Sequence, residues 1–304
     1  MGKKKKNREN LPEGMSRKQA KLAARAAERA ALMGENRPFE GLAAEPQLVA
    51  LQEFIPSAYA KVEVAGSERE VYICTVLPGA VAALVRDNEA GGEAFVAMQT
   101  QHRTKTQGKD LAYALNWAIS AAPGSTLAPG HQDGSQPALT ELLSADSELD
   151  VQAFDTFDWW VPEGQTSDEQ TGRMLQMAND TIIPSQQVHA SVPGALWWVD
   201  PGEKAHIRWV RQDDEDKLLA ALARIGAAGK LHLGEDTKFA GTFRTHGLVV
   251  PVFDLDPTIT AQEFVPAIEE LNAVIEAELN NDAQLTAEER KALNNIKSRQ
   301  LTIR

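Results

Sequence analysis

The sequence predicts an α+β protein of two halves, preceded by a short basic arm. Patterns typical of strands and of helices are mixed along the chain, without the regular strand–helix–strand alternation of a doubly wound sheet. The length of 304 residues suits one large or two moderate domains. An apolar content of 43% supplies a core without disulfides or a structural metal. We therefore expect mixed or antiparallel sheets with packed helices.

The predicted arm covers residues 1–37. It holds eleven lysines and arginines against four acids, a net charge of +7, whereas the rest of the chain (20 bases and 39 acids) carries −19. Residues 1–14 are polar, which predicts disorder, and residues 16–33 form an alanine-rich helix pattern with a basic stripe. The arm residues expected to contact an anionic partner are Lys3, Lys4, Lys5, Lys6, Arg8, Lys18, Lys21, Arg25 and Arg29.

Three interpretations of the arm stay open. It binds nucleic acid or ribosomal RNA by charge, it binds an acidic protein surface, or it only keeps the protein in solution. If Met15 were the true start of the chain, the lysine run would be lost.

The first half is predicted over residues 38–135. A helix at 46–54 precedes strands at 60–64, 70–77 and 94–100, and a helix at 109–120 places Leu111, Leu115 and Ile119 on one face. Residues 122–138 are rich in glycine and proline and are therefore expected to form a loop or linker.

The second half is predicted over residues 136–304. The expected helices lie at 138–143, 167–179, 213–225 and 260–279, with a last one capped by Thr286. The expected strands lie at 151–161, 195–199, 205–210, 242–246 and 248–255, and Pro251 predicts an edge strand or a bend. Each half contains helix, strand, strand and a longer helix in that order, so we also consider an ancient duplication.

No recognised catalytic motif is present. The nearest match to a phosphate-binding loop, at 103–110, has Arg103 in place of its first glycine and Asp110 in place of its hydroxyl residue. The dinucleotide-binding fingerprint and the hydrolase nucleophile elbow are absent, and the six histidines lack zinc-site spacing. We expect no metal and no cofactor.

A small set of body residues remains as a candidate site. The chain has two adjacent tryptophan pairs, and neighbouring residues of a strand face opposite ways, so one member of each pair could lie outside the core. Two histidines lie near arginines and could act as bases, although a structural or surface role is favoured for each of them. The candidates are Trp160, Trp198, His206, Arg208, Arg244 and His246.

The cysteine content and the hydropathy pattern predict a cytoplasmic protein without a membrane segment. Cys74 is the single cysteine and lies in an apolar strand pattern, so a buried hydrophobic role is favoured over a nucleophile. No run approaches the roughly 18 apolar residues of a membrane-spanning helix.

Six segments of the chain resemble a family of uncharacterised actinobacterial proteins. They are RPFEGL (37–42), VALQEFIP (49–56), TVLP (75–78), WVP (160–162), HIRWV (206–210) and GTFRTHGL (241–248). The resemblance runs from about residue 37 to the C-terminus and implies no known chemistry. Some relatives begin with a cysteine-rich SEC-C zinc motif; the arm of this chain has no cysteine, so a zinc role is not implied.

From these observations we expect a non-enzymatic binding or adaptor protein. Its basic arm would dock on nucleic acid, the ribosome or an acidic partner. The alternative is an enzyme, such as a hydrolase, with a dispersed histidine and arginine site in the second half.

Overall fold

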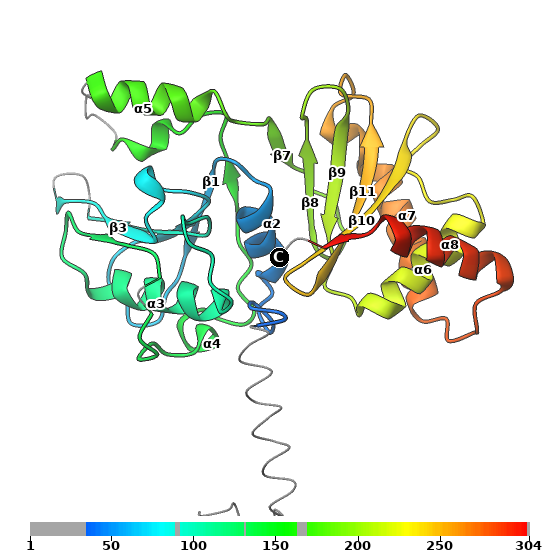
Figure 1. The fold of residues 1–304 in the computed structure, drawn as a ribbon, viewed down its shortest axis with the longest axis horizontal. Coiled ribbons are helices and arrows are strands. Elements are labelled where there is room, and N and C mark those ends of the chain that lie inside the picture. The colour runs from blue at the N-terminus through cyan, green and yellow to red at the C-terminus, as the bar shows by residue number, and fades with distance from the viewer. Residues whose placement is uncertain (1–34, 89–91, 131, 163–168, 303–304) are drawn as a thin grey trace, which may run out of the picture.

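The computed structural model describes residues 35–88, 92–130, 132–162 and 169–302. Two six-stranded sheets lie side by side with helix α2 (Glu45–Glu53) between them (Figure 1). The α+β class expected from the sequence is confirmed, with one mixed sheet in each half.

The first sheet has the strand order β5-β3-β4-β2-β1-β6. Strands β2 and β4 are parallel, and the remaining neighbours are antiparallel. Its strands are β1 (Ala58–Val62), β2 (Val71–Cys74), β3 (Ala83–Val85), β4 (Ala94–Ala97), β5 (Thr126–Leu127) and β6 (Gln152–Ala153). Helix α3 (Gln107–Ser120) packs on β3 and β4, and the short α4 (Leu139–Leu142) packs on α3.

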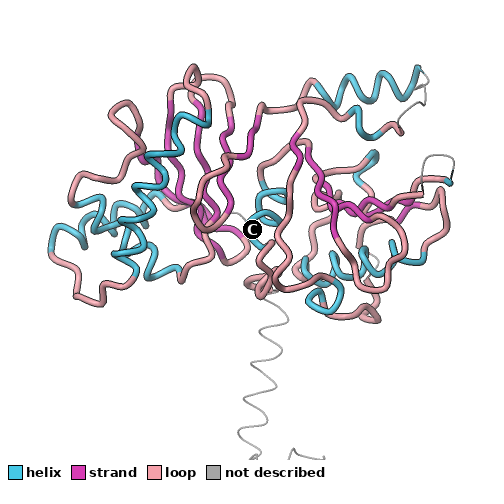
Figure 2. Tube along the Cα trace, turned by 180° about the vertical axis from the view of Figure 1, so that it is seen from behind, coloured by secondary structure: helices cyan, strands magenta, loops and turns pink. Residues whose placement is uncertain are grey.

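The second sheet has the order β12-β10-β11-β9-β8-β7, antiparallel except for the pair β10–β12. Its strands are β7 (Ser185–Gln187), β8 (Ala195–Val199), β9 (Ala205–Val210), β10 (Lys238–Thr245), β11 (Leu248–Leu255) and β12 (Leu301–Thr302). Three helices cover the face turned away from α2: α6 (Glu215–Ala227), α7 (Val265–Leu279) and α8 (Ala287–Arg299) (Figure 2). Helix α5 (Glu169–Asn179) lies in the segment that joins the two halves.

Helix α2 belongs to the cores of both halves. It is buried on nearly all sides, the polar Glu45 and Gln52 included, and Leu48, Val49, Ala50 and Leu51 have no exposed surface. The same apolar cluster contains strand residues of the first sheet and, from the second sheet, Trp197, Val199, Val210, Leu248 and Val250. Because this cluster spans both sheets, the halves share a core, whereas a second cluster, between the second sheet and helices α6, α7 and α8, belongs to the second half alone.

Two expectations about strands are corrected. Residues 151–161 were expected to alternate as one strand, but only β6 is extended, and Asp158–Trp160 form a 3-10 turn. Pro251 lies in β11, which is an inner strand and not an edge. Strands β9 and β11 are paired at Val249 and again from Val252, but not between these residues. Pro251 lies in this gap, so its missing N–H costs no hydrogen bond to β9.

The tryptophans divide between core and partly exposed positions. Trp197 and Trp209 are completely buried, whereas Trp198, the neighbour of Trp197 on β8, is partly buried on the opposite face. Trp159 and Trp160 do not alternate across a strand, because both lie on the 3-10 turn.

Replacing Leu51 by alanine tests whether the two halves share one core. The Leu51→Ala variant should lose about 2–5 kcal/mol of unfolding free energy, because the deletion leaves a cavity in a fully buried site. It should still unfold in one transition, followed by circular dichroism and tryptophan fluorescence in urea. Leu301→Ala is the matched control: this side chain is 71% exposed, and a change within about 0.5 kcal/mol is expected. Two separate transitions, of which only one shifts in Leu51→Ala, would contradict the shared core.

Candidate functional site

A buried carboxylate fixes the beginning of α2. Glu45 is completely buried, and the guanidinium of Arg37 donates to both of its oxygens at 2.7 Å. Gln212, from the second half, donates to Glu45 Oε2 at 2.9 Å and to the carbonyl of Leu42 at 3.2 Å. A buried charge requires such pairing, so these contacts tie the segment before α2 to the second half.

A second carboxylate lies at the end of α2 and contacts both halves. Glu53 Oε1 lies 3.0 Å from Arg103 Nη1, in the first half, and 2.6 Å from His246 Nε2, in the second half. The side chains of Glu53 and His246 are almost fully buried. The ring of Phe39 lies 5.9 Å from that of His246 and completes the contact.

His246 reaches Glu53 because of the geometry of its hairpin. His246 and Gly247 form the two-residue loop between β10 and β11, and both have positive φ, 48° and 76°. Loops of this kind match the twist of the strands but require the left-handed backbone at both positions. A non-glycine residue rarely adopts it, so the hydrogen bond to Glu53 stabilises a conformation that His246 would otherwise disfavour.

Residues 35–39 run between two glycines, one from each half. A Cβ on Gly108, at the start of α3, would lie 2.3 Å from the carbonyl oxygen of Pro38. A Cβ on Gly247 would lie 2.5 Å from the carbonyl oxygen of Asn36. The backbone of residues 35–39 therefore lies so close to Gly108 and Gly247 that any side chain at either glycine would clash with it. These two contacts hold residues 35–39 at the junction of the halves.

Glu35 caps helix α3 from far away in the sequence. Thr106, at the N-cap position, gives no side-chain cap, and Glu35 Oε2 instead accepts the Gly108 N–H at 2.8 Å. Burial raises the pKa of Glu35 above its usual value, while the hydrogen bond from Gly108 lowers it. We call residues 35–39 together with Glu53, Arg103, Gly108, His246 and Gly247 the junction site.

The structure does not bring the six body candidates together. His206 and Arg208 lie on the face of the second sheet that is turned toward α2. His206 Nδ1 lies 3.1 Å from Asp254, and Arg208 packs over the ring of Phe54 at 5.3 Å, where burial lowers its pKa. Both contacts explain these side chains as packing and ion-pair partners.

The other candidates lie on separate surfaces. Arg244 faces the helices and pairs with Glu215 of α6 at 2.7 Å. Trp198 is on that same face, and its indole N–H has no hydrogen-bond partner among the described residues. Trp160 packs on Phe157 and donates to the carbonyl of Val76, just after β2 of the first sheet, at 3.0 Å. Only His246 belongs to the junction site.

The nine candidate residues of the arm lie outside the described residues. The single cysteine agrees with its expected structural role: Cys74 is buried, and burial raises the pKa of its thiol. Within the described ranges, no cluster of three or more His, Cys, Asp or Glu side chains could hold a metal ion. In the same part of the chain, no helix combines the length and apolarity needed to cross a membrane.

Sequence reasoning missed most of the junction site. Glu53, Arg103 and Glu35 are charged residues without a motif, and their partners are distant in sequence. Glu53 and His246 are separated by 193 positions. The one usable signal was the pair His246-Gly247 between two apolar runs, which is a hairpin pattern.

The fold and the junction site define a class: an α+β protein whose two sheets share one buried helix, with the base of a basic arm held between the halves. The chain belongs to a family described as "Family of unknown function (DUF5926)", whose model matches residues 38–304. No curated protein and no solved structure matches the chain.

Replacing Gly247 by alanine tests the close approach at the hairpin. Gly247→Ala places a Cβ against the Asn36 carbonyl in addition to the strain of a positive φ, so a loss well above 1 kcal/mol of unfolding free energy is expected. Gly66→Ala is the control: its φ of 80° is similar, but nothing lies within 4 Å of the added Cβ. Equal losses in urea unfolding for the two variants would contradict the contact with Asn36.

The pH dependence of stability tests the state of Glu35. Since its pKa is raised by burial, the folded protein favours the protonated carboxyl, and this contribution to stability is lost as pH rises above the ordinary value of about 4.3. Glu35→Gln keeps an acceptor for the Gly108 N–H without the charge. Its stability relative to the wild type should therefore increase between pH 4 and pH 7 in urea unfolding. A variant that becomes relatively less stable over this range would show that the charged hydrogen bond outweighs burial.

Proposed function

We propose that this protein is a non-enzymatic adaptor that docks on nucleic acid, either free or in the ribosome, through its basic arm. The acidic body then presents a second surface to another partner. The proposed location is the cytoplasm, in agreement with a single buried cysteine.

The charge distribution supports an anionic partner for the arm. Residues 1–34 carry ten lysines and arginines and three acids, a net charge of +7, and the remaining 21 bases and 40 acids give −19. Clustered bases bind the phosphate backbone without reading its sequence. The acidic body repels the same polyanion, so binding is confined to the arm.

The observation that carries the proposal is the anchoring of the arm at its base. Arg37 and Glu35, which the sequence assigned to the arm, contact Glu45 and the start of α3. A tail that only solubilised the protein would need no such attachment. Here the base of the arm touches both halves, so the chain leaves the body at a defined place.

The enzyme hypothesis has no comparable support. His206 and Arg208 lie on one face of the second sheet, and Arg244 lies on the other. A catalytic site built from these residues would need all of them within hydrogen-bond distance of one reacting atom, and side chains on opposite faces of a sheet do not meet this condition.

Neutralising the lysine run tests the arm without disturbing its base. Deleting residues 1–37 would be a poor test, because it removes the partner of the buried Glu45. In Lys3→Gln/Lys4→Gln/Lys5→Gln/Lys6→Gln, binding to a fluorescent single-stranded RNA is measured by anisotropy at several KCl concentrations. Binding weakens as salt rises, and each phosphate contact contributes about −0.7 to the slope of log K against log salt. The magnitude of this slope should therefore be smaller by about 3 in the variant than in the wild-type protein.

The matched control removes the same charge from the body. Lys61, Lys204, Lys230 and Lys238 are all exposed, and their joint replacement by glutamine should leave the slope unchanged. An equal change in the two variants, or no RNA binding by the wild-type protein, would contradict docking through the arm.

A further inference from the structure

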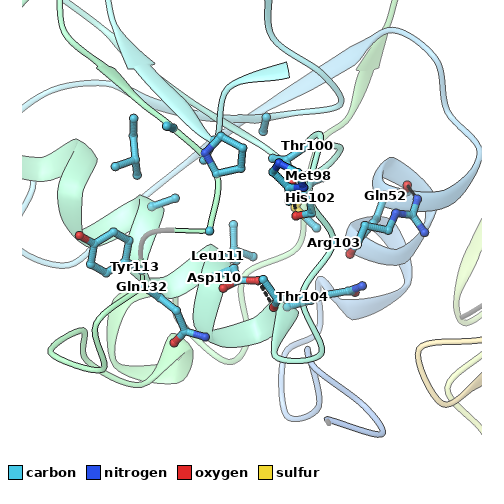
Figure 3. A pocket seen from close by; sticks show the side chains of 18 of the residues that line it. Gln52, Met98, Thr100, His102, Arg103, Thr104, Asp110, Leu111, Tyr113 and Gln132 are labelled. Atoms are coloured by element: carbon cyan, nitrogen blue, oxygen red, sulfur yellow. Dashed lines mark hydrogen bonds between the residues drawn. The ribbon is translucent and has the colours of Figure 1, made fainter. Parts of the chain in front are cut away.

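A small cavity lies in the first half, directly beside the junction site. It is formed by the segment that follows β4, the first turns of α3, the end of α2, residues 127–130 and Gln132 (Figure 3). Its volume is about 50 Å³. Since one water needs about 10–15 Å³ by the same measure, the space accommodates a molecule of about three or four non-hydrogen atoms. Part of the wall is apolar, contributed by Ala97, Leu111, Ala114 and Leu127.

Two side-chain carbonyls of the cavity wall have no donor. Gln52 of α2 is only 5% exposed, and its Oε1 atom has no hydrogen-bond partner among the described residues. Gln107, at the start of α3, likewise has a buried and unpaired Oε1 atom in that part of the chain. Buried acceptors are normally satisfied, so these two atoms at one cavity call for a donor in the cavity, either ordered water or a ligand that replaces it.

The same wall carries a carboxylate without a cationic partner. Asp110 lies one turn after Gln107 on the same side of α3, and it accepts a hydrogen bond from the hydroxyl of Thr104. Within the described residues, no Lys, Arg or His side chain forms an ion pair with Asp110. Burial raises the pKa of Asp110, as expected for a carboxylate that lacks a counter-ion.

The nearby Arg103 does not supply this missing charge. Its Nη1 atom lies 3.0 Å from Glu53 Oε1, and its Nη2 atom donates to the carbonyl of Gln52. The guanidinium is thus turned toward α2 and is already paired (Figure 3). Among the described lining residues, the other basic side chain is His102, so Asp110 is the ionisable acid that a cation entering the cavity would meet.

We propose that this cavity binds a small primary ammonium compound that carries a second hydrogen-bond donor, such as an amino alcohol. The ammonium group lies between the Asp110 carboxylate and Gln107 Oε1, and the second donor reaches Gln52 Oε1. The apolar wall contacts the short carbon chain between them. This site is independent of the arm.

Titration with ethanolamine, followed by ¹H–¹⁵N spectra of the full-length protein, tests the proposal. Shifts are expected in residues 98–114, in residues 127–130 and in Gln132, with a dissociation constant on the order of 1 mM for a ligand of four non-hydrogen atoms. Ethylene glycol, which lacks the charge, should bind at least tenfold more weakly. Equal binding of ethylene glycol, or no shift in these residues at 50 mM ethanolamine, would overturn the proposal.

Two variants assign the contacts. Asp110→Asn keeps the shape of the side chain and should weaken ethanolamine binding at least tenfold, whereas Asp282→Asn, an exposed carboxylate of the second half, should change nothing. Gln52→Met should weaken ethanolamine about three- to tenfold but leave ethylammonium, which has no hydroxyl, unaffected. A spectrum that matches the wild type shows that each variant is folded. Unchanged binding in Asp110→Asn, or equal losses for both amines in Gln52→Met, would count against the site.

Discussion

The pairing of Glu45 with Arg37 and Gln212 is the constraint on which the arrangement of the halves depends. A carboxylate with no exposed surface must be matched by donors, and its three hydrogen bonds come from the segment before α2 and from the second half. Helix α2 is thereby oriented between the sheets. Its apolar side chains then fill the space on both sides, and the two sheets become one core.

This arrangement explains why the junction is built from close backbone contacts. The segment at 35–39 enters α2 through the gap between the start of α3 and the β10–β11 hairpin, and a side chain on Gly108 or Gly247 would close that gap. Glu53, at the other end of α2, links the same two regions through Arg103 and His246. The two ends of α2 therefore hold both halves together, and the base of the arm lies where they meet.

The candidate sites follow from this geometry in different ways. The arm is a property of composition, and its proposed role rests on charge that acts over a distance of about 8 Å at physiological salt. The cavity is a property of packing, because it lies where α2, α3 and the segment after β4 meet without filling the space. The two proposed sites use opposite charges, a basic arm and the Asp110 carboxylate.

The sequence by itself determined the class of fold and most of its elements. Apolar periodicity placed α3, α6, α7, β8, β9 and the β10–β11 pair, because their spacing reflects one buried face. It also determined the charge division and the buried role of Cys74. The strand predicted at 151–161 was wrong because its aromatic residues alternate without forming a strand. Phe157 and Trp159 pack on one another at a 3-10 turn.

Only the tertiary structure decided which charged residues act together. Glu45 with Gln212 and Glu53 with His246 are joined across 167 and 193 positions, and no local pattern encodes such distances. Short strands such as β5 and β7 also depend on their neighbours, because a strand of two or three residues has no periodicity of its own. Local patterns record which face of an element is buried, whereas the partner that buries it is chosen by the packing of the whole chain.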